Sequence, residues 1–185
     1  FGFSKWACSL NLFNENTQTI EVWVKDISDT DHQRCYYWYG RDNESINELW
    51  LAWEAKVPTK TFHFKGEKKR ALDNYLFEKT DYGKFPTEVK NQIRSTDEVY
   101  FNLAYFKFGY LVATDYEELS TESIELLQRF AKVFEQTYTR FLDLQKAEAQ
   151  AREAQIEAAL EKVRSRSMAM HKSDELLDVV NTVFE

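Results

Sequence analysis

The sequence has few of the residues from which catalytic and cofactor sites are usually built. Its 185 residues include only 3 histidines and 5 glycines. The glycines occur singly, so the chain has no glycine-rich phosphate loop. His32, His63 and His171 lack the spacing to one another or to a cysteine that a metal site needs. We therefore expect no catalytic residue, no metal site and no cofactor in this chain.

Cysteine is equally scarce. Cys8 and Cys35 are too few and too far apart for a disulfide framework or a zinc site. We expect both to be reduced thiols in the core of a cytoplasmic protein.

Long apolar runs and an excess of positive charge are also missing. No segment has the length and apolar character of a membrane span, and no signal-peptide pattern opens the sequence. The net charge of −7 argues against a nucleic-acid surface, because phosphate binding needs concentrated cationic residues. The one basic run, KGEKKR at 65–70, contains a glutamate and is interpreted as a solvated loop. We expect no nucleic-acid partner and no membrane contact.

Aromatic residues, by contrast, make up 16% of the chain, and all but Phe184 precede Leu144. The hydrophobic core is therefore expected in the amino-terminal part. The segment from Gln145 to Ser167 contains no glycine, proline or aromatic residue, so it is expected to have a different structural role.

The periodicity of apolar residues predicts an α+β fold with a largely antiparallel sheet. Alternating patterns predict strands at 5–13, 19–26, 35–39 and 59–64, and two strands within 98–114 that meet near 107–109. Helical spacing predicts helices at 44–56, 68–79, 87–94 and from 120 or 121 to 145. Asn43 or Ser45 is the expected cap of the first helix, and Ser120 or Thr121 that of the last.

Two segments carry a resemblance to a known family. LSTESIELLQRFAKVFEQTYTRFLDLQ, which follows a pair of predicted strands, resembles the closing helix of a GAF domain. AQAREAQIEAALEKVRSRSMAMHKSDELLDVV resembles the linker between GAF-like domains in multidomain bacterial sensors, notably sensor histidine kinases and cyclase-linked relatives. The resemblance implies a GAF-like central antiparallel sheet of about six strands flanked by helices, and a role in small-ligand sensing or dimerisation.

The resemblance also implies a domain organisation. We expect a GAF-like domain at 1–140 that lacks the usual amino-terminal helix, and a coiled-coil signalling helix at 141–172. Residues 173–185, capped by Ser173, would begin the first helix of a following domain. The chain itself is expected to be no enzyme; if the parent is a histidine kinase or a cyclase, its catalysis lies downstream.

Three kinds of GAF chemistry can be compared with the sequence. The Asn-Lys-X-Phe-Asp-Glu signature of cyclic-nucleotide-binding members is absent, and neither cysteine has the context of a bilin attachment site. A thiol-based GAF enzyme would require Cys8 or Cys35 to be exposed and acidic.

Aromatic residues from several predicted elements would surround the ligand cavity of a GAF domain. They are Trp38, Trp50, Trp53, Phe62, Tyr75 and Tyr100. One interpretation is a pocket for an apolar or aromatic small molecule. The other, which we favour, is an aromatic core that fills its own cavity, because large side chains take up the space a ligand would need.

The carboxy-terminal helix carries a seven-residue repeat of apolar positions. The expected dimer seam consists of Leu142, Ala149, Ile156, Leu160, Val163 and Met170. A second, patchier row contains Leu144, Ala151 and Ala158. A helix folded back on its own domain would carry bulky apolar residues here instead of alanines, so a parallel homodimeric coiled coil is the favoured interpretation.

These observations lead to one main hypothesis. The chain is expected to be a regulatory or sensory GAF-like module of a cytoplasmic signalling protein, a sensor histidine kinase by resemblance, that relays its state through a dimeric helix. The alternative is a purely structural dimerisation domain without a small-molecule ligand.

Overall fold

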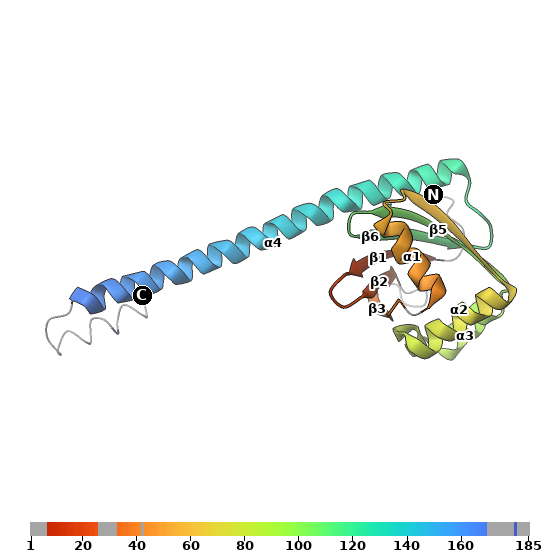
Figure 1. Cartoon of the computed structure of the whole chain (residues 1–185), viewed down its shortest axis with the longest axis horizontal. Coiled ribbons are helices and arrows are strands. Elements are labelled where there is room, and N and C mark those ends of the chain that lie inside the picture. Colours follow the sequence, from red (N-terminus) through yellow and green to blue (C-terminus); the bar gives the residue numbers. More distant parts are fainter. Residues whose placement is uncertain (1–6, 26–32, 42, 170–179, 181–185) are drawn as a thin grey trace. The chain divides into compact units, whose positions relative to one another are not determined.

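A computed structural model describes residues 7–25, 33–41, 43–169 and 180 of the chain (Figure 1). The strands are β1 (Ala7–Asn14), β2 (Thr19–Lys25), β3 (Gln33–Tyr39), β4 (Thr59–Lys65), β5 (Glu98–Phe106) and β6 (Gly109–Asp115). The helices are α1 (Glu44–Glu54), α2 (Gly66–Lys79), the 3-10 helix η1 (Asp81–Lys84), α3 (Thr87–Arg94) and α4 (Thr121–Ala169). The predicted α+β class is confirmed.

The strands form one six-stranded antiparallel sheet in the order β3-β2-β1-β6-β5-β4. The pairs β1–β2 and β5–β6 are the hairpins that the short connections predict. The two halves are joined by the pairing of β1 with β6, in which Leu10 lies opposite Leu111. This long-range pairing places β1 and β6 at the centre and β3 and β4 at the edges.

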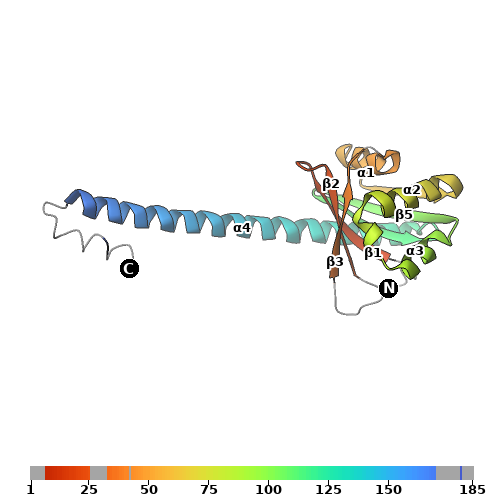
Figure 2. The same ribbon diagram turned by 90° about the horizontal axis from the view of Figure 1, so that it is seen from below.

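Each face of the sheet has its own hydrophobic core, because successive strand residues point to opposite faces. The first, which we call the helix-side core, lies between the sheet and helices α1 and α2, and η1 packs at its margin. Its buried members include Ile20, Val22, Ile46, Leu49, Trp50, Phe62, Phe64, Leu72, Leu76, Leu103, Tyr110 and Val112. Figure 2 shows α2 and α3, which contact each other, at the same end of the sheet.

The second, the α4-side core, lies on the opposite face. It joins Ala104, Phe106, Leu111 and Ala113 of the sheet to Leu127 and Ala131 of α4. The first turns of α4 are therefore fixed by the packing of their apolar side chains against the sheet.

Gly109 marks a close approach between the two central strands. A Cβ atom at this position would lie 1.8 Å from the carbonyl oxygen of Asn11 in β1. The backbone N–H of Phe13 donates a hydrogen bond of 2.9 Å to the carbonyl of Phe108 at the same place. The sequence explains this glycine by turn conformation, whereas the structure shows that the missing side chain is what lets β1 and β6 pair.

Two of the predicted helix caps are present. The side chain of Asn43 accepts a hydrogen bond of 3.2 Å from the backbone N–H of Ile46 at the start of α1. At the start of α4, the Ser120 hydroxyl accepts one of 3.3 Å from the N–H of Ser123. The pKa of Glu122 is lowered by hydrogen bonds from its own backbone N–H and from the Ser120 hydroxyl, as expected for an acid in a first helical turn.

The basic run at 65–70 is not a solvated loop, so this prediction is wrong. Gly66 has a φ of 57°, which turns the chain from β4 directly into α2, and its N–H donates to the carbonyl of Asp97 at 2.9 Å. All four positively charged residues of the run thus lie in or beside the first turns of a helix, and one of them, Lys69, is buried.

The 3-10 helix η1 was not predicted, and it lies against the edge strand β3. The Asp81 carboxylate accepts a hydrogen bond of 3.2 Å from the backbone N–H of Tyr37, which points outward from the sheet edge. Lys84 forms an ion pair of 2.7 Å with the other oxygen of Asp81. The outer edge of β3 is therefore occupied by an acidic side chain of the same domain.

The chain divides into two compact units, residues 1–135 and 136–185, and the division falls within α4. Among the described residues, none of the helices combines the length and the apolar character that crossing a membrane requires.

Candidate functional site

The centre of the helix-side core is an aromatic cluster around Phe13. The Phe13 ring lies 4.4 Å from that of Trp50, 4.6 Å from that of Trp53 and 5.5 Å from that of Tyr110, between centroids. Tyr105 extends the cluster, at 5.6 Å from Tyr110. Tilted ring pairs at these distances are in favourable contact, so the rings fill the space between α1 and the sheet.

A second aromatic cluster lies where η1 meets β3. The Tyr82 ring lies 5.6 Å from Tyr36, 5.5 Å from Trp38 and 4.5 Å from Phe85. Burial raises the pKa of the Tyr82 hydroxyl above its ordinary range. This phenol stays protonated and contributes packing rather than charge.

The six residues predicted to line a ligand pocket do not all lie together. Trp38, Trp50 and Phe62 are buried members of the helix-side core, and Trp53 and Tyr75 pack against it. Tyr100 lies on the other face of the sheet, stacked on His63 with 4.1 Å between ring centroids. The reason is the alternation of β5, which points its neighbour Phe101 toward the helix-side core.

The aromatic cluster around Phe13 also holds two polar atoms without a hydrogen-bond partner among the described residues. They are the indole Nε1 of Trp50, a residue only 1% exposed, and the hydroxyl of Tyr110. Trp53, beside them, donates its indole N–H to the carbonyl of Phe106 at 3.0 Å. Burial holds the pKa of Tyr110 well above its ordinary value, so its hydroxyl keeps its proton. A molecule bound here would have to present hydrogen-bond acceptors, while the packed rings around both groups match the favoured interpretation of a filled core.

The other face carries a polar cluster at the edge of the sheet. The Glu98 carboxylate lies 3.0 Å from His63 Nε2 and 3.1 Å from Lys65 Nζ. The hydrogen bond from Lys65, and then that from His63, lowers the pKa of Glu98. All three side chains are exposed to solvent, so this cluster is an ordinary surface ion pair network.

Nothing in the described part of the chain brings three metal-ligating side chains together. His32 and His171 lie outside the described residues, as does the side chain of Cys35.

Cys8 was predicted to be a core thiol, and this prediction is wrong: it is an exposed, free cysteine. It lies near the start of β1. Partial burial of the thiol nevertheless raises its pKa, which lowers the fraction of reactive thiolate. Cys8 thus has the exposure, but not the acidity, that thiol chemistry requires.

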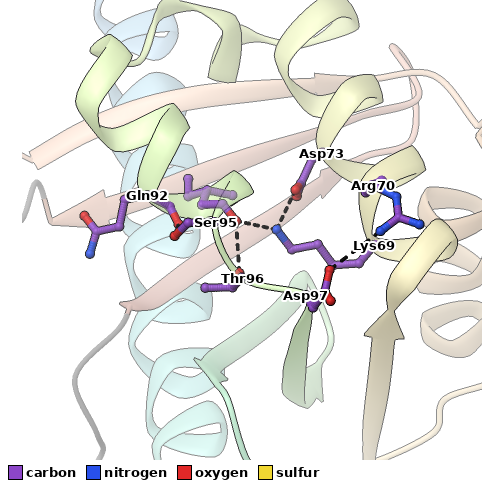
Figure 3. A network of polar contacts seen from close by, with 8 residues as sticks. Lys69, Arg70, Asp73, Gln92, Ser95, Thr96 and Asp97 are labelled. Atoms are coloured by element: carbon purple, nitrogen blue, oxygen red, sulfur yellow. Dashed lines mark hydrogen bonds and ion pairs between the residues drawn. The ribbon is translucent and has the colours of Figure 1, made fainter.

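The one buried ion pair in the described residues joins Lys69 and Asp73, one turn apart on α2 (Figure 3). Lys69 is 2% exposed. Its ammonium group donates to the Asp73 carboxylate and to the backbone carbonyl of Ile93 at the end of α3, both at 2.5 Å. The Thr96 hydroxyl donates to the same carbonyl at 2.9 Å. Lys69 therefore links α2 to α3, a helix that has no buried residue of its own.

Burial raises the pKa of Asp73, against the opposing effect of the hydrogen bond from Lys69. The sequence could not reveal this pair, because a lysine and an aspartate four residues apart on a helix are usually exposed. The contacts of Lys69 tie two helices together, which is a structural role.

The predicted dimer seam lies on the exposed part of α4. Ala149, Ile156 and Leu160 are exposed, Leu142 and Val163 are partly exposed, and Met170 lies outside the described residues. From residue 143 to 168 all side chains except Val163 are exposed. Apolar side chains at helical spacing thus have no cover within the described chain.

Comparisons with protein-family models, with curated proteins and with solved structures found no significant match to this chain.

Proposed function

We propose that this chain is a regulatory module of a cytoplasmic signal-transduction protein, GAF-like in architecture. It acts as a parallel homodimer through α4 and passes the state of its α/β domain to a downstream output domain. In the parent protein that output would be a histidine kinase or a cyclase, and catalysis would belong to that domain rather than to this chain.

The observation that carries the proposal is the single 49-residue helix α4. Leu127 and Ala131 anchor its first turns in the α4-side core. Beyond them, the same helix exposes apolar residues such as Ile156 and Leu160. A helix whose first turns belong to a domain core, and whose later described turns expose apolar side chains, can convert a change in the domain into a change in helix packing.

The GAF resemblance supports the same proposal. It implies an antiparallel sheet of about six strands, helices on its faces and a long closing helix, and the chain has these features. Folds of this kind serve several functions, so the relay role depends on α4 rather than on the sheet.

A proline in α4 tests self-association without assuming which face of the helix is used. We expect Ala147→Pro to weaken dimerisation more than tenfold, because proline removes a backbone hydrogen bond and kinks a helix interior at a cost of about 3 kcal/mol. The measurement is molar mass by light scattering and sedimentation over a concentration series. Ala147→Gln, which keeps the helix, is the matched control. A wild-type chain that is monomeric at every concentration in the series would contradict the proposal.

The alternative of a structural dimerisation domain without a ligand is favoured by the packed aromatic rings around Phe13. A thermal-shift screen against metabolites, followed by calorimetry, separates the two functions. A ligand that raises the melting temperature and gives saturable heat would establish sensing. If no metabolite binds in either measurement, the structural dimerisation domain is favoured.

A further inference from the structure

Three buried side chains on or beside the central strand β1 each hold one polar atom without a hydrogen-bond partner among the described residues. The atoms are Asn11 Oδ1, Trp50 Nε1 and the Tyr110 hydroxyl, and each of the three residues is only 1% exposed. A fourth such atom, Trp38 Nε1, belongs to the second aromatic cluster. Leaving a buried polar atom unbonded costs free energy, and leucine or phenylalanine could pack here without that cost. The three residues therefore point to a bound group that completes their hydrogen bonds.

Asn11 turns its side chain toward the helix-side core. Its neighbours Leu10 and Leu12 pack against the α4-side core, and successive strand residues point to opposite faces. The Asn11 amide nitrogen donates to the carbonyl and to the hydroxyl of Ser9, at 3.3 and 3.0 Å. Because a carbonyl only accepts, the nitrogen must lie on this side of the amide, and Oδ1 points away from Ser9. The unpartnered atom of Asn11 is thus an acceptor that needs a donor.

The three residues are neighbours in the fold. Tyr110 of β6 lies directly opposite Asn11 in the strand register, where facing Cβ atoms are about 4.5–5.5 Å apart. Two residues along β1, the Phe13 ring lies 5.5 Å from that of Tyr110 and 4.4 Å from that of Trp50. Residues 11 and 13 share one face of β1. The acceptor and the two ring groups therefore belong to one small stretch of the core.

Other polar ring groups of the same cluster are paired within the protein. Trp53 Nε1 donates to the carbonyl of Phe106 at 3.0 Å, and the Tyr105 hydroxyl donates to that of Leu49 at 3.3 Å. This packing therefore satisfies polar ring groups where a backbone carbonyl is within reach, which sets the two unpartnered ring groups apart.

The chemistry of the three atoms defines what can bind. The bound group must donate to Asn11 Oδ1 and accept from Trp50 Nε1, while the Tyr110 hydroxyl can do either. Arg41, whose guanidinium lies 5.1 Å from the Trp50 ring, is already bonded to two side chains of α1. A charged ligand would find no free counter-charge on Arg41, and burying an unpaired charge is costly. The site therefore suits an uncharged group that both donates and accepts.

A hydroxyl oxygen meets these requirements and is small enough for a packed core. A water molecule takes about 30 Å³ of liquid volume and typically makes about three hydrogen bonds inside a protein. The rings around Phe13 can thus fill the apolar space and still leave room for one such group.

We propose that Asn11, Trp50 and Tyr110 form an interior binding site for one hydroxyl- or carboxamide-type group. The group belongs either to a water molecule held in the core or to a small uncharged molecule that the domain binds. In the second case the site defines the ligand class of the proposed sensory module. The site does not depend on self-association through α4, so the molar mass of the chain tests the proposed function separately.

The test compares the full wild-type chain with three variants. Tyr110→Phe removes one hydroxyl and keeps the ring, and Asn11→Leu removes the acceptor from the opposite strand. Tyr105→Phe is the matched control, because its hydroxyl already has the Leu49 carbonyl as a partner. Oxygen-17 relaxation of water over a range of magnetic fields detects water molecules that are held longer than the protein tumbles. If water is the source, Tyr110→Phe and Asn11→Leu should each lose the contribution of at least one water, and Tyr105→Phe should lose none.

A small-molecule source gives a different result. In native mass spectrometry the chain should then carry an added mass that is lost on denaturation. Tyr110→Phe should weaken this binding about two- to tenfold, the effect of one lost hydrogen bond, and so lower the occupied fraction. Tyr105→Phe should leave the occupied fraction unchanged.

Two results would overturn the site. One is a wild-type chain that has no added mass and no held water that depends on Asn11 or Tyr110. The other is an equal effect of Tyr105→Phe, which would place the bound group elsewhere in the cluster. A monomeric chain that gives either expected signal would contradict the proposed function and leave the site standing.

Discussion

Replacing Lys69 with methionine is expected to lower the free energy of unfolding by about 3–5 kcal/mol, because it leaves the buried Asp73 without its partner. Methionine has a similar volume, so the loss is electrostatic rather than a cavity effect. The carbonyl of Ile93 keeps its hydrogen bond from Thr96, whereas the Asp73 carboxylate loses the ammonium group that pairs with it.

The loss of unfolding free energy in Lys69→Met should depend on pH in a defined direction. Burial already raises the pKa of Asp73 in the folded protein, and removal of Lys69 raises it further. A carboxyl whose pKa is higher folded than unfolded stabilises the fold below its unfolded pKa, and this stabilisation is lost as pH rises through the folded pKa. The difference from wild type should therefore be largest at neutral pH and shrink toward pH 4. Urea unfolding at a series of pH values measures it.

The matched control is the double variant Lys69→Met/Asp73→Leu. It removes both charges and should recover most of the lost stability, since apolar replacements of buried ion pairs are often neutral or stabilising. A single variant as stable as the wild type, or a double variant no better than the single one, would show that the pair is not a buried ion pair in solution.

Gly109→Ala is expected to destabilise the domain by about 3 kcal/mol or more, at or beyond the upper end of overpacking effects. The added methyl group would overlap the Asn11 carbonyl oxygen, a backbone atom that cannot move without separating β1 from β6. Because this pairing joins the two halves of the sheet, the whole domain should melt at a lower temperature in calorimetry.

Lys107→Ala is the control for Gly109→Ala. Lys107 lies in the same hairpin and is exposed, and its substitution should change the melting temperature little. An unchanged melting temperature for Gly109→Ala would mean that the central strands are farther apart than described.

Local patterns predicted most of the elements of this fold. The alternation in β1 and β2 and the short link between them were sufficient to identify the hairpin, and Asn43 was correctly proposed as a cap of α1. These features depend on residues close in sequence, where propensity and periodicity act directly.

Features that depend on distant residues were not accessible in the same way. No local signal shows that β1 pairs with β6 or that Tyr100 points away from the other predicted pocket residues. Lys69 looked solvated because its partners include a carbonyl 24 residues away, on another helix. The short η1 has too few residues for a periodic pattern.

The Asp81 contact with β3 has a consequence for how copies of this chain can associate. Exposed edge strands offer unpaired N–H groups to which another strand can add. Here the N–H of Tyr37 is already taken by a carboxylate, and an incoming strand would have to displace it and its ion pair with Lys84. Growth of the sheet from this edge into open-ended aggregates is thereby discouraged, so strand addition there would not compete with the proposed pairing of helices.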